Sequence, residues 1–182
     1  MKRNFILAAL LIIVAFAGTS CKKDHNAPST DFNTPATPPP SGFQAGTYAN
    51  GFQNMLELYD VYTGKVIGPA WKSGVVFTFP ANGKSAEFYY TAETQYMQAA
   101  TKATGTVAFD EGSTAAAGSF TFYGDWAHYN GYGTTTVNRD ATKEELANNL
   151  TGKYFYKMEG QWLRIEPGGP VNEYSKSFEL IQ

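Results

Sequence analysis

The sequence is poor in the side chains that build metal and redox sites. Its 182 residues include one cysteine and two histidines. A single cysteine has no partner in its own chain, so an internal disulfide framework is excluded. One histidine, His128, remains after the N-terminal region, and a site made of several histidines is therefore excluded as well. We expect neither a bound metal nor a cofactor.

Sequence signatures of enzymes are also missing. The chain has no Gly-x-Ser-x-Gly elbow, phosphate-binding loop, dinucleotide fingerprint or His-Glu-x-x-His motif. Carboxylate pairs occur at 110–111 and 144–145, in an expected turn and an expected helix, where acidic side chains are usually solvated. We expect no catalytic residues and no enzymatic activity. The alternative is a glycosidase-like activity, because two carboxylates brought together by the fold are sufficient for that chemistry.

The chain lacks a cluster of positive charge and a long apolar segment. It carries 14 basic and 16 acidic residues, with a formal net charge of −2. Nucleic-acid binding needs a clustered basic surface, so we expect no nucleic-acid partner. The apolar run from Phe5 to Ala17 is shorter than the roughly 20 residues that a spanning helix needs. No period of 20 to 50 residues repeats, which argues against solenoids and propellers.

The N-terminal residues follow the order of an export signal. Two basic residues at 2–3 precede the apolar run 5–17, and the small residues 18–20 lead directly to Cys21. This order is typical of a secretory signal with a small-residue cleavage site, and it predicts a signal peptide over residues 1–20. The alternative is an ordinary signal peptide followed by an incidental cysteine.

A cysteine directly after the small residues resembles the lipobox of bacterial lipoproteins. The resemblance implies that Cys21 is lipidated and begins the mature chain. Lipidation also resolves the difficulty of an unpaired thiol in an oxidising compartment, because the sulfur becomes a thioether. We therefore expect a protein of the bacterial cell envelope that is attached to the membrane through its lipid, in the outer membrane of a Gram-negative cell.

The segment after Cys21 differs in composition from the rest. Five of the nine prolines lie between residues 28 and 40, among few apolar side chains. Such a segment buries too little surface to offset its ordering entropy. We expect a disordered, proline-rich tether over residues 21–43 that holds a domain of residues 44–182 away from the membrane. The alternative for the proline-rich stretch is a recognition ligand for an aromatic groove.

Hairpin signals divide the domain into strands. Asn82-Gly83 is a favoured two-residue turn, because both residue types accept positive φ. This turn pairs Phe77 with Phe88 and Val75 with Tyr90 on one apolar face. Asn130-Gly131 is a second pair of the same kind. A helix is expected only over 142–150, where Thr142 and Glu145 have the spacing of a capping box.

These patterns predict an all-β domain. Eight to ten antiparallel strands joined by hairpins favour an up-and-down barrel with one short helix, and a two-sheet β-sandwich is the alternative. The stretch Leu150–Tyr156, followed by Gly160–Ile165, resembles the closing hairpin of small lipocalin-like domains found in bacterial lipoproteins. The resemblance implies a lipocalin-like barrel.

The segment from Phe120 to Tyr132 is the densest cluster of aromatic side chains. A turn at Asn130-Gly131 places Trp126 and His128 on the inner face, near the rim where a barrel admits ligands. Aromatic faces and hydrogen-bonding groups together can form a ligand platform, although ordinary core packing is the alternative. The candidate ligand-binding residues, all assigned to the inner face, are Phe122, Trp126, His128, Tyr154 and Tyr156.

Two functions remain open from the sequence. In the first, a lipid-anchored lipoprotein binds a small apolar or saccharide ligand in its barrel. In the second, a non-catalytic structural or interaction subunit of an envelope complex has a filled barrel and contacts another envelope protein. The bulky residues on the predicted inner faces do not separate the two, because separating them requires the empty volume inside the barrel.

Overall fold

The computed structural model of the chain describes residues 32–60, 63–93 and 97–182. The expected signal peptide, Cys21 and the first part of the expected tether lie outside the described residues. In the described part of the chain, no helix has the length and apolar character that crossing a lipid bilayer requires.

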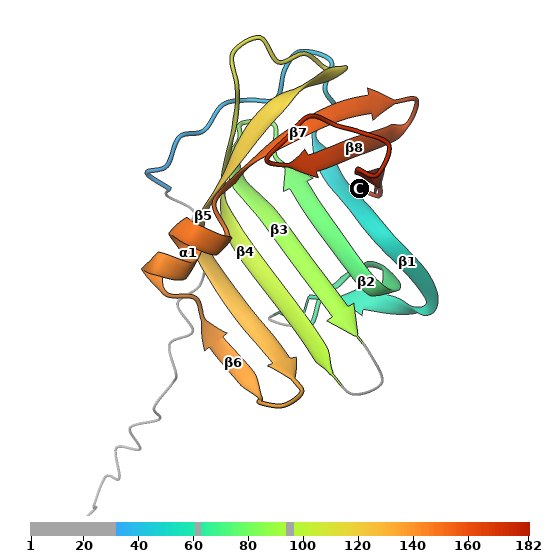
Figure 1. Cartoon of the computed structure of the whole chain (residues 1–182), viewed down its shortest axis with the longest axis vertical. Coiled ribbons are helices and arrows are strands. Elements are labelled where there is room, and N and C mark those ends of the chain that lie inside the picture. Colours follow the sequence, from blue (N-terminus) through green and yellow to red (C-terminus); the bar gives the residue numbers. More distant parts are fainter. Residues whose placement is uncertain (1–31, 61–62, 94–96) are drawn as a thin grey trace, which may run out of the picture.

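The described residues form nine strands and one helix (Figure 1). Every pair of neighbouring strands in the sheet is antiparallel, and turns or short loops join most consecutive strands. The elements are β1 Gly46–Tyr59, β2 Val66–Phe79, β3 Lys84–Glu93, β4 Gln98–Phe109, β5 Ala117–Tyr132, β6 Val137–Asp140, α1 Lys143–Asn149, β7 Gly152–Glu159, β8 Trp162–Pro167 and β9 Lys176–Leu180.

Eight of these strands close into a barrel. The sheet runs β4-β3-β2-β1-β9-β8-β7-β5, and an additional pairing between β4 and β5 joins its two ends. The first and last strands meet where Tyr48 pairs with Leu180. β6 is an extra strand that pairs with β5. The expected all-β, antiparallel, lipocalin-like barrel with one short helix is confirmed, and the sandwich alternative is excluded because the sheet has no break between two layers.

The hairpin predicted at Asn82-Gly83 is present in the predicted register. Phe77 pairs with Phe88 and Val75 with Tyr90. Gly83 has φ +71°, the left-handed conformation that glycine adopts without strain. The helix is also as predicted: the Thr142 side chain accepts from the Glu145 amide, and the Glu145 side chain accepts from the Thr142 amide. Both are local signals, and the local sequence was sufficient to find them.

The second predicted turn, at Asn130-Gly131, is wrong. Both residues lie within β5, where Asn130 pairs with Ala100 and Gly131 with Ala99. The chain reverses later, over residues 133–136, before β6 begins. The reason for the glycine is a close approach to β4: a Cβ at Gly131 would lie 2.5 Å from the carbonyl oxygen of Gln98. A glycine that serves a close contact has the same sequence signature as a glycine that serves a turn.

One end of the barrel is filled by aromatic rings. Phe79 and Phe120 meet with ring centroids 5.1 Å apart, and Phe109 and Tyr156 lie beside them. Phe43, from the segment before β1, closes this cluster with its ring 5.4 Å from that of Phe79. Edge-to-face contacts of this kind add to the stabilisation that burial itself provides. This end of the barrel is therefore packed core.

Residues 32–43, which we call the N-terminal strap, pack on the outside of β4 and β5. The Thr37 amide donates to the carbonyl of Val107, and the Thr34 hydroxyl donates to Asp125 at 2.7 Å. The expectation of a disordered tether up to residue 43 is therefore wrong for this stretch. The prolines do not prevent order, because side-chain hydroxyls and the Phe43 ring supply the contacts that the segment's composition did not suggest.

Candidate functional site

An irregularity in β5 decides which side chains point into the barrel. Between β4 and β5, Thr104 pairs with Trp126, but the next β4 residue, Gly105, pairs with Gly124. Asp125 is thus an extra residue in β5, and such a β-bulge shifts the alternation of the strand by one position. A Cβ at Gly105 would lie 1.8 Å from the carbonyl oxygen of Tyr123, so the bulge requires glycine at that position.

The bulge reverses the predicted orientation of Trp126 and His128. Phe122, before the bulge, lies in the core as predicted, but after the bulge Ala127 is the core residue, with 1% of its surface exposed. Trp126 and His128 alternate with Ala127 and therefore face the outside of the barrel. Tyr129 alternates with His128, so the predicted inward position of His128 implied that Tyr129 faces outward; in the structure it packs against the core from inside. The inward assignment of Trp126 and His128 is corrected.

His128 makes hydrogen bonds to neighbouring side chains on the outer face of the barrel. Its two ring nitrogens lie 2.8 Å from the Asp140 carboxylate and 2.8 Å from the Asn138 side-chain oxygen. Both partners belong to β6, so the buried imidazole attaches this extra strand to β5. The Trp126 ring stacks on His128 with centroids 6.2 Å apart. The two residues therefore form part of the wall around the barrel and do not line its interior.

The remaining candidates lie inside but belong to packed regions. Tyr156 is almost fully buried, and its hydroxyl donates to the carbonyl of Thr114 at 2.5 Å. Burial raises the pKa of the Tyr156 hydroxyl to about 12, because the phenolate would lose its hydration. Tyr154 stacks on Phe120 at 5.3 Å, and burial raises its pKa too. Tyr154 and Tyr156 both contact Phe120, whereas Phe122 contacts Phe88. Phe122 and Tyr156 belong to the core, and Tyr154 lines a smaller hollow beside it.

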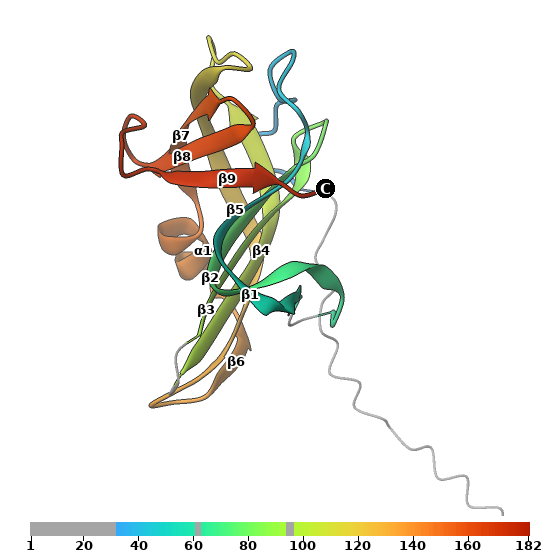
Figure 2. The same ribbon diagram turned by 90° about the vertical axis from the view of Figure 1, so that its right-hand side faces the viewer.

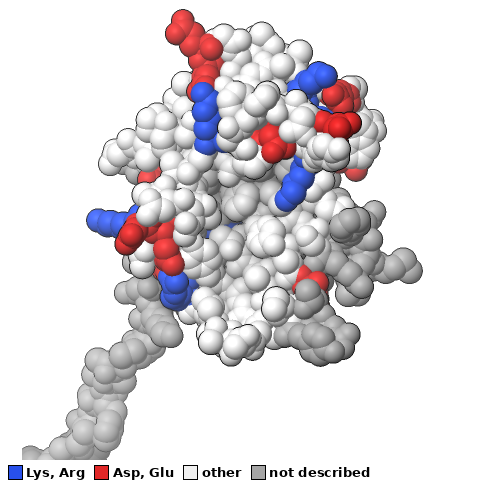
Figure 3. Space-filling view, viewed as in Figure 1, with Lys and Arg blue, Asp and Glu red and all other residues white. Residues whose placement is uncertain are grey.

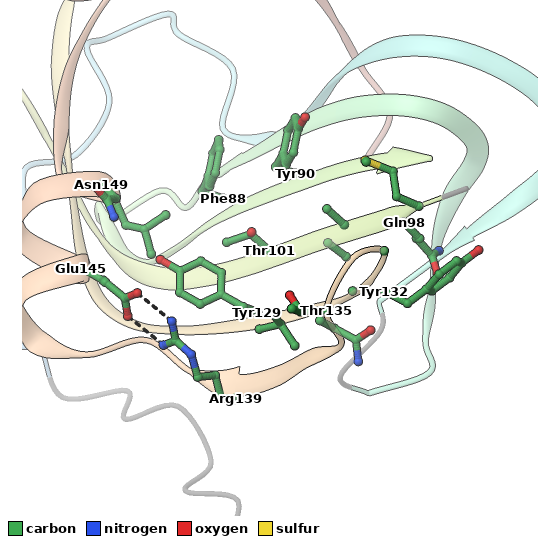
Figure 4. Close-up of a pocket in the computed structure, with 18 residues that line it drawn as sticks. Phe88, Tyr90, Gln98, Thr101, Tyr129, Tyr132, Thr135, Arg139, Glu145 and Asn149 are labelled. Carbon is green, nitrogen blue, oxygen red and sulfur yellow. Dashed lines mark hydrogen bonds and ion pairs between the residues drawn. The ribbon is translucent and has the colours of Figure 1, made fainter. Parts of the chain in front are cut away.

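The opposite end of the barrel is open and contains a cavity of about 650 Å³ (Figure 4). Its walls come from β3, β4, β5, β6 and α1. Phe88 and Tyr90 project from β3, and Tyr129 faces the same space from β5. Leu150, after α1, and Val137, on β6, complete the apolar lining. The volume falls within the range of roughly 300–1,000 Å³ that small-molecule sites usually have.

A paired charge lies at the rim of this cavity. The Arg139 guanidinium donates two hydrogen bonds to the Glu145 carboxylate, each 2.8 Å long, and lies 5.3 Å from the centre of the Tyr129 ring. The bidentate contact with Arg139 lowers the pKa of the Glu145 carboxyl to about 2. Burial, with the Glu145 charge as a second cause, raises the pKa of Tyr129. The pair joins α1 to β6, and its opposite charges neutralise each other.

The polar groups around the cavity are mostly uncharged. Thr101 faces the cavity with its hydroxyl, and Asn149 of α1 lies at its edge, whereas Asn130 contributes to the wall as a residue of β5 whose side chain alternates with Tyr129. Tyr132 stands at the mouth with half of its surface exposed. Such a lining offers a ligand broad apolar contact and a few hydrogen bonds that can fix its orientation.

A second hollow adjoins the first. It has a volume of about 380 Å³, shares Phe88 and Tyr90 with the larger cavity, and extends toward Tyr174 in the loop between β8 and β9. The space-filling view shows this face of the molecule as hollowed and largely uncharged at its centre, with charged side chains toward the edges (Figure 3). The two aromatic side chains of β3 therefore form a ridge between two apolar hollows.

A further cavity, of about 420 Å³, lies on the outer face of β2, β3 and β4 and has a different character. Lys102 on its floor is buried and forms a short ion pair with Asp60, and Glu87 lies 3.5 Å from the same ammonium group. Desolvation by burial lowers the pKa of Lys102, but its bonds and charge interactions with Asp60 and Glu87 outweigh this and raise it. We infer that the ion pair between Asp60 and Lys102 attaches the end of β1 to the outside of the barrel.

The site differs from the predicted one in a way that the sequence partly signals. Phe88 and Tyr90 were assigned to the inner face. Their alternation along the strand does not indicate whether an inward side chain lines a cavity or packs in the core. Tyr129 was missed because the bulge at Asp125 was not recognised. The available signal was the glycine at 105 and its partner at 124, since glycine inside a strand often marks a bulge.

Neither the lining nor the comparisons assign a reaction to this chain. Among residues 32–60, 63–93 and 97–182, no group of three or more His, Cys, Asp or Glu side chains is placed to hold a metal ion. Comparisons with protein-family models, with curated proteins and with solved structures gave no match. The geometry of the open end is therefore the basis for a functional proposal.

Proposed function

We propose that this chain is an exported, lipid-anchored lipoprotein of the bacterial envelope whose barrel binds a small, largely apolar ligand without catalysing a reaction. The observation that carries the binding proposal is the asymmetry of the interior. One end is filled by the rings of Phe43, Phe79 and Phe120, whereas the other holds a cavity of about 650 Å³ lined by Phe88, Tyr90 and Tyr129.

The lining favours a neutral ligand that contains a ring. Aromatic side chains stack on or edge against rings, and four of them line the same cavity here. Among the described residues that line the cavity, the charged side chains are Arg139 and Glu145, and these satisfy each other, which disfavours an ionic ligand. Hydroxyl and amide groups can bind one or two polar substituents. A saccharide is the second candidate, because the same ring contacts and amides suit a sugar ring.

The anchor half of the proposal depends on the N-terminal residues. The basic, apolar and small-residue segments in order, followed by the sole cysteine at position 21, support export and lipidation. Intact mass of the membrane-extracted protein should show cleavage before Cys21 and added acyl chains. The Cys21→Ser variant should be released in soluble form. A mature chain that begins elsewhere, or a free thiol at Cys21, contradicts this half.

The binding half is tested with N-phenyl-1-naphthylamine, a neutral ring probe whose fluorescence rises in apolar sites. Saturable binding to the full chain is expected. Ala99 is exposed at the cavity wall, so Ala99→Trp should place an indole ring in the space and weaken probe binding. Ala116 is also exposed but lies in the loop after β4 at the packed end, so Ala116→Trp is the matched control and should bind normally.

Two further variants locate the site. Phe88→Ala should weaken probe binding by about 1–3 kcal/mol, the scale of a lost aromatic contact. Trp126→Ala should leave it unchanged, because Trp126 faces outward. A parallel calorimetric titration with methyl glucosides decides between the apolar and the saccharide ligand. If neither the probe nor the sugars bind the folded chain, the binding proposal fails and the interaction-subunit function takes its place.

A further inference from the structure

The second hollow, of about 380 Å³, has no part in the function proposed above, although it adjoins the cavity. Phe88 and Tyr90 line both spaces, so a ligand in the cavity meets the second hollow across these two side chains. Figure 2 shows α1, which borders the cavity, and the loop between β8 and β9, which borders the second hollow, on the same side of the long strands β2, β3 and β4. One ligand can therefore occupy both spaces.

The second hollow is lined mainly by side chains of the core. Two charged residues, Glu166 and Lys176, also belong to its described lining, and their charges are opposite in sign. Like the cavity, this space therefore favours an uncharged, apolar group. The buried side chains of the lining, which come from β2, β8 and β9, are Val75, Phe77, Ile165 and Phe178.

Tyr154 brings to the second hollow a hydrogen-bonding group that the protein does not use. Its ring stacks on Phe120, and burial raises the pKa of its hydroxyl, because the phenolate would lose hydration. Within the described part of the chain, no group donates to this hydroxyl or accepts from it. By contrast, the Tyr156 hydroxyl, on the same strand, donates to the Thr114 carbonyl. A partly desolvated hydroxyl without a protein partner suits the polar group of a ligand.

Tyr174 stands at the edge of the second hollow, on a loop whose backbone is held in place. The Tyr174 amide donates to the side-chain oxygen of Asn172 at 2.9 Å. Nη2 of Arg164 lies 2.8–3.1 Å from three main-chain carbonyl oxygens of the loop, those of Asn172, Glu173 and Ser175. The Tyr174 ring itself is 87% exposed. The loop thus fixes an aromatic ring beside an apolar space, where a bound ligand would cover it.

We propose that the second hollow is a second subsite for the same ligand, and that the ligand is an elongated neutral molecule with two apolar parts. One part lies in the cavity. The other lies in the second hollow, where it packs against Tyr174 and carries a polar group that hydrogen-bonds to the Tyr154 hydroxyl. The proposal rests on the binding function proposed above and extends it, because a ligand confined to the cavity contacts neither of these tyrosines.

The second subsite is tested with two neutral probes of different length. 1-Naphthylamine has one ring system, and N-phenyl-1-naphthylamine has a phenyl group in addition. We expect Tyr174→Ala to weaken binding of the longer probe about three- to tenfold, the scale of one aromatic contact, and to leave binding of 1-naphthylamine unchanged. Lys176 is exposed on the same lining, so Lys176→Trp should place an indole ring in the second hollow and also weaken only the longer probe.

Two other aromatic residues provide the matched controls. Tyr132 lines the cavity but not the second hollow, so Tyr132→Ala should weaken both probes by a similar factor. Trp162 is 41% exposed and lines neither space, so Trp162→Ala should change neither affinity. If Tyr174→Ala and Lys176→Trp affect both probes equally, or affect neither, the second subsite is overturned.

The role of the Tyr154 hydroxyl is tested by adding a hydroxyl group to the longer probe. N-(4-hydroxyphenyl)-1-naphthylamine should bind the parent chain about two- to tenfold more tightly than N-phenyl-1-naphthylamine, the scale of one hydrogen bond. Tyr154→Phe keeps the ring that stacks on Phe120 and removes only the hydroxyl, so it should abolish this gain. A gain that is absent from the parent chain, or that survives Tyr154→Phe, overturns the hydrogen bond assigned to Tyr154.

The failures of the two proposals are distinguishable. If neither naphthylamine binds the folded chain, the proposed function fails and the second subsite fails with it. If 1-naphthylamine binds and Ala99→Trp weakens it, but the longer probe is insensitive to Tyr174→Ala and Lys176→Trp, the cavity binds a ligand and the second subsite alone fails. Circular dichroism of each variant checks its folding; the substituted positions 174 and 176 are both exposed.

Discussion

Replacing Phe43 by alanine tests whether the strap is part of the folded domain. The Phe43 ring is buried to 9% exposure and lies between 5.4 and 6.0 Å from the rings of Tyr48, Phe79, Phe109 and Tyr156. Truncation of a buried phenylalanine removes its transfer free energy and leaves a cavity, and together these terms are typically about 3–5 kcal/mol. We expect a loss of this size in the free energy of unfolding.

The expected loss is large enough to measure by two methods. For a domain of this length the unfolding entropy makes about 3–5 kcal/mol equivalent to a fall of roughly 10–17 °C in Tm. Urea unfolding should show a lower midpoint with an unchanged slope. Tyr174→Ala is the control, because Tyr174 is 87% exposed and its truncation should change stability by no more than about 0.5 kcal/mol. A Phe43→Ala chain within 1 kcal/mol of the parent refutes the packing of the strap.

Two pH-dependent predictions follow from the shifted tyrosine and glutamate. The raised pKa of Tyr156 stabilises the fold fully below pH 10, and this contribution is lost as the pH rises toward about 12. Tyr156→Phe should lower the free energy of unfolding by about 1 kcal/mol at neutral pH, because the hydrogen bond is lost. Above pH 10 the urea midpoint of this variant should fall less steeply with pH than that of the parent. An equally steep fall contradicts the raised pKa of Tyr156. The lowered pKa of Glu145 stabilises the fold above its usual value of 4.5, and this contribution is lost as the pH falls toward about 2. In Glu145→Gln the acid dependence of the urea midpoint between those values should shrink, and a profile identical to the parent's would show that the Arg139 pair does not form in solution.

Local sequence signals predicted the elements well. Asn82-Gly83 fixed a hairpin and its register, because the turn residues and the alternation of Phe77 and Phe88 agree over a few positions. The Thr142 and Glu145 spacing fixed the start of α1 for the same reason. The barrel followed from the number of hairpins and from the apolar face that each pair of strands must bury. None of these inferences required knowledge of distant contacts.

The position of the site depended on contacts that local patterns do not encode. The bulge at Asp125 exists because Gly105, far away in sequence, lets β4 and β5 approach closely. One extra residue in a strand reverses every later side chain, so Trp126 and His128 moved outside and Tyr129 moved inside. The order of the strap likewise depends on distant partners, since Thr34 and Thr37 bind residues 72 to 91 positions away.

The sequence by itself determined that this chain forms a small all-β domain with one short helix, and it favoured a barrel over a sandwich, because turn chemistry and the alternation of apolar residues act within single hairpins. Only the tertiary structure decided which end of the barrel is filled, which faces of β5 point inward and where the strap lies. Those features arise from close approaches between strands and from the packing of Phe43 into a core built by residues of several strands. Such contacts depend on the closed barrel as a whole, and no local segment of the sequence specifies them.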